Sequence, residues 1–335
     1  MTSDIDIVIT WVDGNDPAWQ TERAKYDVND HDDNRIQRYR DMGTLKYVFR
    51  GIENFAPWVR KIFFVTWGHL PEWLDTTNPK LVIVNHEDFI PKEYLPTFNS
   101  NTIDLNLFRI PDLSENFVYF NDDTFLLKPV KPDFFFKNGK PRCEAILNPL
   151  IPLKYHQNLV ITSDAEIINE HFNWRSVVRK HPFQWFNPKY GALGIVNFLM
   201  LPWGRVPGFF ISHFPSSLQR KTFETLWTIE SKYFEETCAN RFRGALDTNQ
   251  WVAQWWQMCS GNFVPRSVHV GFGNYYIRDD DANNQKIFND IRNQKYYLYS
   301  INDGVETGDF DAIMAEYAAA FDTVLPNKSS YEKEM

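Results

Sequence analysis

An amide and two adjacent carboxylates interrupt an apolar run in the first half of the chain. Asn121, Asp122 and Asp123 follow aromatic and β-branched residues at 118–120, and apolar residues resume at position 125. Adjacent carboxylates repel each other and lose hydration in an apolar setting, so the pair needs a compensating charge. A divalent cation at the end of a strand supplies that charge and can in turn hold the phosphates of a substrate. The alternative is a solvated turn between two strands, since Asn and Asp favour turns.

Another acidic side chain follows the first strand-like run of the chain. Residues 5–12 are β-branched and apolar, which is typical of a buried strand, and Asp13 opens a turn over residues 13–17. Folds of the α/β class that bind nucleotides place the ligand at the carboxyl edge of the sheet, after such strands. Asp13 is therefore a candidate ligand of a metal or a substrate, the alternative being an ordinary turn residue.

Basic, imidazole and amide side chains elsewhere could complete such a site. Arg35, Arg38 and Arg40 could form either an exposed helix face or an anion clamp that reaches a phosphate. His213 follows a short strand-like run, where a histidine serves either as a structural hydrogen-bonding residue or in proton transfer near neutral pH. Asn302 follows another strand-like run, so polar groups stand at several expected strand ends.

The elements that would position these residues alternate between strands and helices, which predicts an α/β fold with a mostly parallel central sheet covered by helices. The region of residues 128–208 fits this pattern less well and is expected to include a hairpin or loop excursion, and the polar tail from Lys328 is expected to be frayed. Strands are expected at residues 5–12, 61–66, 80–85, 209–212 and 296–300, with a pair of strands at 118–127. Helices are expected at 44–54, 102–110, 222–243, 250–258 and 309–321, and residues 174–187 are expected to form either a surface helix or a wall over the site.

Composition limits the class of protein. The 335 residues, 43% hydrophobic and 23% charged, suit one large globular domain. A net charge of -8 argues against nucleic-acid binding, which requires a basic surface, but it is compatible with a small anionic substrate in a local basic pocket. The 12 Trp, within an aromatic content of 16%, suit either stacking on sugar rings or an aromatic core.

The cysteines and the apolar runs indicate where in the cell the protein is expected. Three widely spaced cysteines form neither a disulfide framework nor a zinc pattern, so we expect a reducing cytoplasm. The acidic first residues lack the basic and apolar regions of a signal peptide. The longest apolar runs, such as residues 194–202, are too short for a transmembrane segment, so we expect at most peripheral association with the inner face of a membrane.

Several segments are similar to sequence blocks of the Stealth family, the bacterial capsular and exopolysaccharide sugar-phosphate transferases related to the animal lysosomal-enzyme N-acetylglucosamine-1-phosphotransferase. Residues 5–17 (IDIVITWVDGNDP) resemble the first block. The second block is matched at residues 45–61, at 95–100 (LPTFNS) and at 119–123 (YFNDD). The weaker third and fourth blocks are matched at His213, Pro215, Lys221, Glu224, Arg243 and residues 301–303, and residues 140–210 match none.

This resemblance implies transfer of a sugar 1-phosphate from a UDP-sugar, either a UDP-N-acetylhexosamine or a UDP-hexose, to a hydroxyl of a capsular or exopolysaccharide glycan. The products would be a phosphodiester and UMP, and the cofactor Mg²⁺ or Mn²⁺. The implied fold is like that of the nucleotide-sugar transferases of GT-A type, with an α-rich C-terminal part. Within a single catalytic domain, residues 1–130 would bind the nucleotide-sugar and the metal, residues 131–210 would form a variable acceptor-binding insertion, and residues 211–327 would complete the active site.

The resemblance and the chemistry of phosphoryl transfer together suggest roles for individual residues. Asp13, Asp122 and Asp123 would bind the metal and the donor, with Asp122 or Asp123 as an alternative base. His213 would deprotonate the acceptor hydroxyl or donate to a phosphate oxygen, and Arg243 would neutralise phosphate charge. The other residues expected to bind substrate are Asn99, Asp104, Arg109, Lys221 and Asn302.

Two other classes of protein stay open on the sequence. A metal-dependent glycosyltransferase that breaks the anomeric bond and releases UDP would use the same metal and nucleotide-sugar features. A carbohydrate-binding protein without catalytic activity would account for the aromatic richness, but not for the carboxylates and amides at several strand ends.

Overall fold

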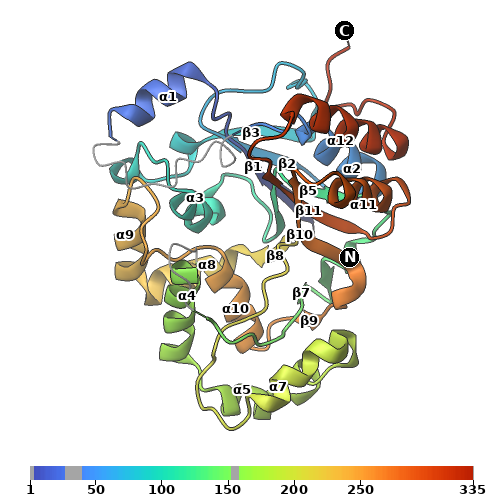
Figure 1. Cartoon of the computed structure of the whole chain (residues 1–335). Helices are drawn as coiled ribbons and strands as arrows, with labels where there is room; N and C mark the ends of the chain where they lie inside the picture. Colours follow the sequence, from blue (N-terminus) through green and yellow to red (C-terminus); the bar gives the residue numbers. More distant parts are fainter. Residues whose placement is uncertain (1–3, 27–39, 152–157, 335) are drawn as a thin grey trace.

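The computed structural model of the chain describes residues 4–26, 40–151 and 158–334. The central sheet contains β1 (Ile5–Thr10), β2 (Ile62–Thr66), β3 (Leu81–Asn85), β4 (Asn116–Asn121) and β8 (Ser216–Gln219). Its strand order is β3-β2-β1-β4-β8, and all neighbouring strands are parallel except β4 and β8 (Figure 1). The expected α/β class with a mostly parallel central sheet is confirmed.

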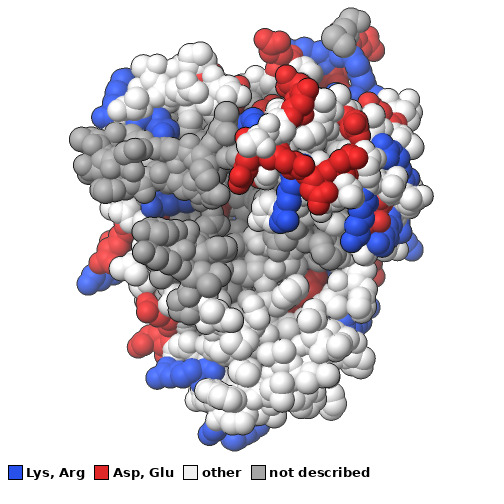
Figure 2. Space-filling view, viewed as in Figure 1, with Lys and Arg blue, Asp and Glu red and all other residues white. Residues whose placement is uncertain are grey.

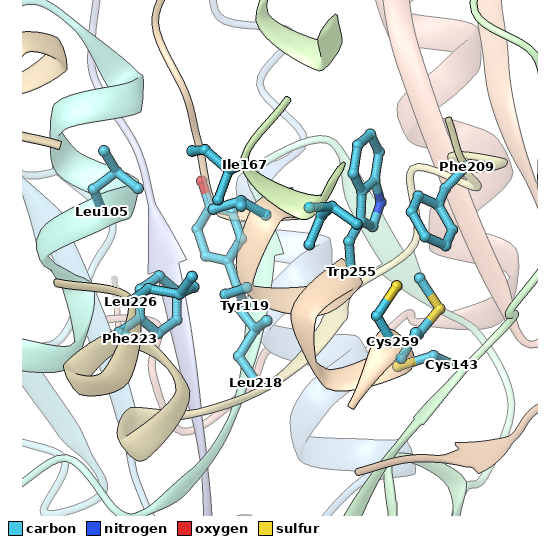
Figure 3. Close-up of a cluster of buried hydrophobic side chains, with 14 of the residues drawn as sticks. Leu105, Tyr119, Cys143, Ile167, Phe209, Leu218, Phe223, Leu226, Trp255 and Cys259 are labelled. Atoms are coloured by element: carbon cyan, nitrogen blue, oxygen red, sulfur yellow. The ribbon is translucent and has the colours of Figure 1, made fainter. Parts of the chain in front are cut away.

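The two faces of this sheet bury two separate apolar cores. Along β1, Val8 lies in one core whereas Ile7 and Ile9 lie in the other, because successive side chains of a strand point to opposite faces. In β4, Tyr119 belongs to the first core, among the apolar side chains drawn in Figure 3, and Val118 belongs to the second. Strands buried on both faces are apolar almost throughout, which is why the sequence revealed these strands clearly.

Helices cover both faces of the sheet, and the expected α-rich C-terminal part is present (Figure 1). The helices predicted at 44–54, 250–258 and 309–321 are confirmed near their expected bounds, as α2, α10 and α12. The α-helices are α1 (Pro17–Ala24), α2 (Leu45–Phe55), α3 (Ser100–Asn106), α4 (Asn158–His171), α5 (Trp174–Lys180), α6 (Pro182–Trp185), α7 (Ile195–Leu199), α8 (Arg220–Ile229), α9 (Ser231–Ala239), α10 (Trp251–Cys259), α11 (Asp281–Arg292) and α12 (Phe310–Val324).

A second sheet, in the order β10-β11-β5, stands beside the first and contains β5 (Thr124–Leu126), β10 (Gly271–Arg278) and β11 (Leu298–Gly304). The two strands expected at residues 118–127 are present as β4 and β5, but they lie in different sheets, because β5 pairs with β11. Helix α2 packs directly on β5, where a Cβ added at Gly51 would collide with the backbone oxygen of Leu126. The chain thus passes from one sheet to the other at residues 121–124.

A third, small sheet confirms the hairpin expected after residue 128. Asn138 and Gly139 both have positive φ, at 55° and 71°, which is the conformation that a tight hairpin turn requires. The sheet contains β6 (Phe136–Lys137), β7 (Lys140–Cys143) and β9 (Val264–Pro265). The short 3-10 helices are η2 (His86–Asp88), η3 (Lys92–Tyr94), η4 (Leu107–Arg109), η5 (Pro132–Phe134), η6 (Pro188–Gly194) and η7 (Val268–Val270).

Four expected elements differ from the structure. The helix predicted at 174–187 is two helices, α5 and α6, separated at His181, whose φ of -131° is not helical. The strand predicted at 209–212 is wrong, because only Phe209 forms an isolated bridge and the positive φ of Gly208 and His213 interrupts an extended ladder. The helix predicted at 222–243 is two helices, α8 and α9, separated at Glu230, whose φ of -123° is not helical. Asn302 lies within β11 and not beyond its end.

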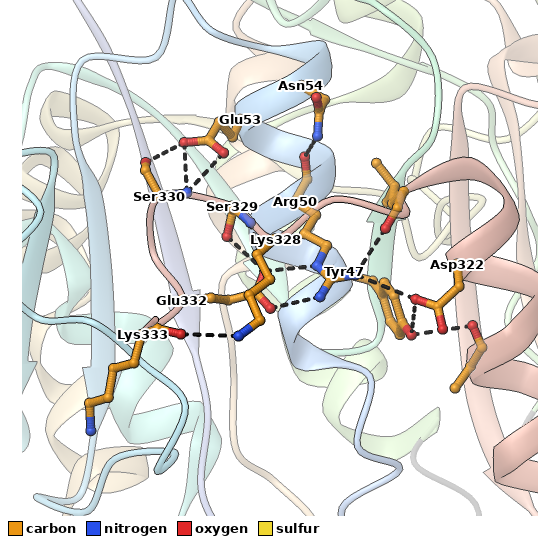
Figure 4. Close-up of polar contacts among 12 residues, drawn as sticks. Tyr47, Arg50, Glu53, Asn54, Asp322, Lys328, Ser329, Ser330, Glu332 and Lys333 are labelled. Carbon is orange, nitrogen blue, oxygen red and sulfur yellow. Dashed lines mark hydrogen bonds and ion pairs between the residues drawn. The ribbon is translucent and has the colours of Figure 1, made fainter. Parts of the chain in front are cut away.

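The tail from residue 328 is docked, so the prediction of a frayed tail is wrong (Figure 4). Arg50 of α2 donates Nε and Nη2 to the two carboxylate oxygens of Glu332, each at 2.7 Å, and Nη1 to the backbone oxygen of Leu325 at 2.9 Å. The Tyr331 side chain is buried in the second core. The predicted fraying rested on polar composition alone, whereas these polar groups find buried partners in α2.

Candidate active site at the carboxyl edge of the central sheet

The two adjacent carboxylates lie in the turn between β4 and β5, at the carboxyl edge of the central sheet. The surrounding protein raises the pKa of Asp122 to about 7 by removing hydration, and the like charges of Asp123 and Asp41 raise it further. Loss of hydration also raises the pKa of Asp123 to about 6, opposed by a hydrogen bond from the Thr124 hydroxyl. The Asp122 side chain nevertheless keeps access to solvent, as a residue that meets a ligand must.

Asp13 lies at the same edge, because it follows β1 and β1 runs parallel to β4. Its backbone NH donates to Nε2 of His69 at 2.8 Å, and its carboxylate accepts the backbone NH of Asn15 at 2.8 Å. Burial lowers the pKa of His69, so the neutral ring can accept this hydrogen bond and hold the turn. The pKa of Asp41 is raised by burial and then by the charge of Asp13, so these acidic groups influence one another.

Arg40 forms neither of the arrangements that the sequence suggested. It donates Nε and Nη2 to the carboxylate of Asp303 at 2.8 and 2.9 Å, and its guanidinium lies 3.7 Å from the centre of the Phe310 ring. This pairing ties the segment that carries Asp41 to β11, so Arg40 positions the acidic edge instead of clamping a phosphate. Arg35 and Arg38 lie outside the described residues.

Strand pairing brings Asn302 and His213 to the same edge. The backbone NH of Ile301 donates to the backbone oxygen of Asp123 at 3.0 Å, which places Asn302 beside the acidic turn. His213 precedes β8, whose Ser216 pairs with Tyr119 in antiparallel register. His213 lies three residues before that pair and Asp122 three residues after it, so both leave the sheet at its carboxyl edge.

The surroundings of His213 keep its imidazole neutral. The ring meets Trp251 edge-on, with ring centroids 5.9 Å apart, and it lines a small cavity together with Glu144 and Gln254. Burial lowers the pKa of His213 below its ordinary value. A neutral imidazole near pH 7 can accept a proton from a hydroxyl, which is the property that a general base needs.

A buried hydrogen-bonded chain lies directly below the edge. The Tyr119 hydroxyl donates to Oδ1 of Asp104 at 2.8 Å and lies 3.0 Å from the Thr10 hydroxyl. Burial raises the pKa of Asp104 to about 7, opposed by the Tyr119 hydrogen bond and the charge of Arg243. Asp104 therefore changes its charge near neutral pH, inside the protein and next to the strand that carries the acidic turn.

Arg243 reaches this region from the loop after α9. Its Nε donates to the Ser100 hydroxyl at 2.9 Å, at the start of α3. The loop is held by Asp247, whose Oδ2 accepts from the Asn99 amide at 2.7 Å and from the backbone NH of Gly244 at 2.8 Å. Asn99 is fully buried and gives its amide to this loop. The contacts of Asn99 therefore position Arg243, in contrast to the expected contact with substrate.

Comparisons with known proteins bear on the identity of the chain. Two family models match the chain: "Stealth protein CR1, conserved region 1" matches residues 3–29, and "Stealth protein CR2, conserved region 2" matches residues 38–143. "Capsular polysaccharide phosphotransferase WcwK" of Streptococcus pneumoniae is 41% identical over 333 residues, which cover 98% of each chain. The chain belongs to the Stealth family. The expectations of a Stealth protein and of a phosphotransferase enzyme are confirmed.

Other relatives of this Stealth protein are also matched over nearly their full length. "Receptor polysaccharide phosphotransferase WefC" of Streptococcus oralis is 40% identical over 98% of this chain and 99% of its own. "Exopolysaccharide phosphotransferase cps2G" of Lactiplantibacillus plantarum is 38% identical over 98% of this chain and 96% of its own. Among solved structures, the galactosyltransferase LgtC with donor and acceptor sugar analogues is 11% identical with a TM-score of 0.41, over 97% of this chain and 98% of its own.

The regions that identify the Stealth protein contain part of the candidate site. Asp13 lies in the first conserved region, and Asp104, Asp122 and Asp123 lie in the second, whereas His213 falls outside both matches. The matches thus cover the acidic edge, and the fold adds to it the residues from the second half of the chain.

Two predicted substrate-binding residues of the Stealth protein are not brought to this edge. Arg109 donates Nε to Asn106 Oδ1 at 3.0 Å, and its guanidinium lies 4.7 Å from the centre of the Trp227 ring. Lys221 lies in the first turn of α8, and its backbone NH contacts Glu115 at the amino end of β4, the opposite edge from Asp122. The contacts of both residues are structural.

The resemblance to the family implies a divalent metal ion, and the carboxylates of Asp122 and Asp123 can be compared with the ligands that such an ion requires. In the part of the chain that the structure describes, no group of three or more His, Cys, Asp and Glu side chains is arranged to hold a metal ion. Asp122 and Asp123 nevertheless fit Mg²⁺, which is commonly bound by one or two carboxylates together with water and substrate phosphates. Burial and then the charge of Asp123 raise the pKa of Asp122, and a bound cation would relieve both the lost hydration and the repulsion.

The described residues also bear on membrane insertion. No helix among them combines the length and the apolar character that crossing a bilayer requires.

Proposed function

We propose that this Stealth protein transfers a sugar 1-phosphate from a UDP-sugar to a hydroxyl of a capsular or exopolysaccharide glycan. The donor would be a UDP-N-acetylhexosamine or a UDP-hexose, and the reaction would release UMP and form a phosphodiester. The names of the full-length relatives support phosphotransfer onto a polysaccharide. The observation that carries the proposal is the convergence of Asp13, Asp122, Asp123, His213 and Asn302 on one edge of the sheet.

In this proposal the acceptor oxygen attacks the β-phosphorus, and the bond between that phosphorus and the oxygen bridging it to the α-phosphate breaks. The anomeric bond of the sugar stays intact, and the acceptor proton passes to His213, whose lowered pKa leaves a nitrogen free to accept it. Asp122 or Asp123 is the alternative base. Arg243 would neutralise charge on the phosphates, and Asn302 would orient the donor.

The acidic turn would hold the diphosphate through a cation. Mg²⁺ or Mn²⁺ bound by Asp122 and Asp123, with Asp13 nearby, would neutralise charge on the transferring and leaving oxygens. Asp104 and Tyr119 lie below the turn and would hold β1 and β4 in register. We place the enzyme in the cytoplasm, at the inner face of the membrane, with residues 131–210 as the acceptor-binding part of one catalytic domain.

A product assay tests this function. The protein is incubated with Mg²⁺, a panel of UDP-sugars and a glycan acceptor, and UMP is separated from UDP by ion-exchange chromatography. UMP together with a new phosphodiester signal of the glycan in phosphorus NMR would support the proposal. UDP as the product would contradict it and assign the same site to a glycosyltransferase that breaks the anomeric bond. Asp123→Asn is the matched control, because it removes one charge at nearly constant shape.

A further inference from the structure

Large apolar side chains are exposed on α6, on α7 and on the residues next to them in the chain. Phe183 is 86% exposed and Leu199 is 60% exposed, far more than apolar side chains of this size usually are. The rings of Phe186 and Phe198 stack with their centroids 3.9 Å apart, which joins α6 to α7 in one surface. We call this surface the apolar end, and its exposed members are Phe183, Leu193, Ile195, Phe198, Leu199 and Trp203.

The same part of the chain is positively charged in an otherwise acidic protein. Residues 171–223 contain no Asp or Glu, although the chain has 43 acidic residues and a net charge of -8. Figure 2 shows acidic side chains gathered over α11 and α12, whereas the lower end, where α5 and α7 lie in Figure 1, has only basic and uncharged surface. The exposed basic residues closest in sequence to the apolar end are Arg175, Arg179, Lys180, Lys189 and Arg205.

The apolar end is a fixed surface, because its inner side is packed and hydrogen-bonded. Trp174 and Trp185 are fully buried and meet edge-to-face with centroids 4.8 Å apart. The buried side chain of Asn197, in α7, accepts from the backbone NH of Leu147 at 2.8 Å and donates to the backbone oxygen of Trp185 at 2.8 Å. Among the described residues, the exposed side chains therefore face away from a completed core.

We propose that the apolar end docks on an anionic phospholipid bilayer. An interfacial element combines aromatic and aliphatic side chains, which enter the acyl boundary, with Lys and Arg, which contact anionic headgroups. Ile195 and Leu199 offer no hydrogen bonds to a glycan, whose hydroxyls require them. A second copy of the chain would bring like charges together around the same surface, which disfavours self-association there.

The docking would hold the active site near the membrane surface. His213 is only eight positions after Arg205, and an extended chain of that length spans at most roughly 28 Å. An acceptor presented at the bilayer would therefore be within reach of the acidic edge. The membrane contact itself does not rest on the proposed reaction, since it is argued from exposure and charge alone.

The test measures binding of the full chain to lipid vesicles by co-sedimentation. Vesicles of phosphatidylcholine mixed with phosphatidylglycerol should bind the protein, pure phosphatidylcholine should bind it much more weakly, and added salt should weaken the binding. The double variant Phe183→Ser, Leu199→Ser should lower the affinity about tenfold or more. The double variant Arg179→Gln, Lys180→Gln should lower it by about fivefold for each charge. Ile229→Ser, at an exposed apolar side chain of α8, should change nothing.

Two outcomes would overturn the proposal. The first is wild-type binding to anionic vesicles that is absent, or that both double variants leave unchanged. The second is a wild-type dimer in light scattering that Phe183→Ser, Leu199→Ser converts to monomer while vesicle binding stays unaltered, which would assign the apolar end to a second copy. Circular dichroism of each variant verifies folding, and the exposure of all four side chains makes an intact fold the expected result.

Discussion

Removing the Tyr119 hydroxyl tests the buried chain beneath the active site. In Tyr119→Phe the ring stays in its core, but Oδ1 of Asp104 loses the donor that lies 2.8 Å away. Below about pH 7 Asp104 is mostly protonated and the loss is that of a neutral hydrogen bond, about 1 kcal/mol. Above that pH the acceptor is a buried carboxylate, and the loss rises to about 1.5–3 kcal/mol.

The sign of the pH dependence follows from the shift of the Asp104 pKa. Because the folded state raises this pKa from 3.8 to about 7, the folded protein binds more protons than the unfolded chain between these two values, and stability falls as the pH rises until the folded pKa has been passed. Tyr119 lowers the pKa, so Tyr119→Phe raises it by about one unit for each 1.4 kcal/mol by which the loss to the charged form of Asp104 exceeds the loss to its protonated form. The destabilisation by Tyr119→Phe should therefore be larger at about pH 8.5 than at about pH 6.

The assay is urea unfolding of wild type and Tyr119→Phe at both pH values, together with the pH profile of kcat. Tyr275→Phe is the matched control, because the Tyr275 hydroxyl donates to Asp290 at 2.7 Å in the second sheet, on a different strand from the acidic turn. We expect both variants to lose stability. Only Tyr119→Phe should shift one limb of the pH profile of kcat to higher pH. An equal loss at the two pH values, with an unmoved kcat profile, would refute the assignment of Asp104 as a group that titrates near neutral pH.

Three further predictions concern the acidic turn, the base and the tail. Asp123→Asn should lower kcat by about 10²–10³, as loss of one well-placed charge does, and chelation of divalent ions should abolish turnover reversibly. His213→Ala should lower kcat by about 10²–10⁴ and remove the acidic limb of the pH–rate profile, since protonation of His213 below its lowered pKa is what inactivates the base. Glu332→Ala should destabilise the protein by about 3–5 kcal/mol in urea unfolding, because the buried Arg50 guanidinium then keeps only the largely exposed carboxylate of Asp322, at 3.4 Å, and the backbone oxygen of Leu325.

Each of these three predictions has a contrary result. Full turnover by Asp123→Asn, or activity that survives chelation, would contradict the proposal that the acidic turn binds a cation. An acidic limb that persists in His213→Ala would transfer the role of base to Asp122 or Asp123. Lys333→Ala, next to Glu332 but exposed, should cost little, and an equal loss in the two tail variants would show that the Arg50 pair is not the cause.

The elements that could be predicted were those encoded by residues close together in the sequence. Strands β1, β2 and β4 are buried on both faces and therefore form apolar runs, and β1 and β4 are followed by the polar residues of the edge. Asp13, Asp122 and Asp123 follow such runs, so their place at one edge was predictable once parallel pairing was expected. His213 and Asn302 were also predicted near the site, although the elements expected around them were wrong in detail.

The features that the sequence did not reveal depend on partners far along the chain. Thr10 is separated from Tyr119 by 109 residues, Asn99 from Asp247 by 148, and Arg40 from Asp303 by 263. No local pattern of spacing encodes such pairs, and only the buried hydroxyl of a tyrosine inside a strand could have prompted a search for a partner. Arg109 and Lys221 were misplaced for the same reason, because the edge of the sheet that a side chain reaches is a tertiary property.

The docked tail bears on the order in which the protein can be completed during synthesis. Arg50 belongs to α2, near the start of the chain, yet the carboxylate that balances its buried charge arrives 282 residues later. Until residue 332 leaves the ribosome, the Arg50 guanidinium lacks its buried carboxylate partner, and the second core lacks Tyr331. The half of the molecule that carries the acidic turn is therefore fully closed only after the half that carries His213 has been made.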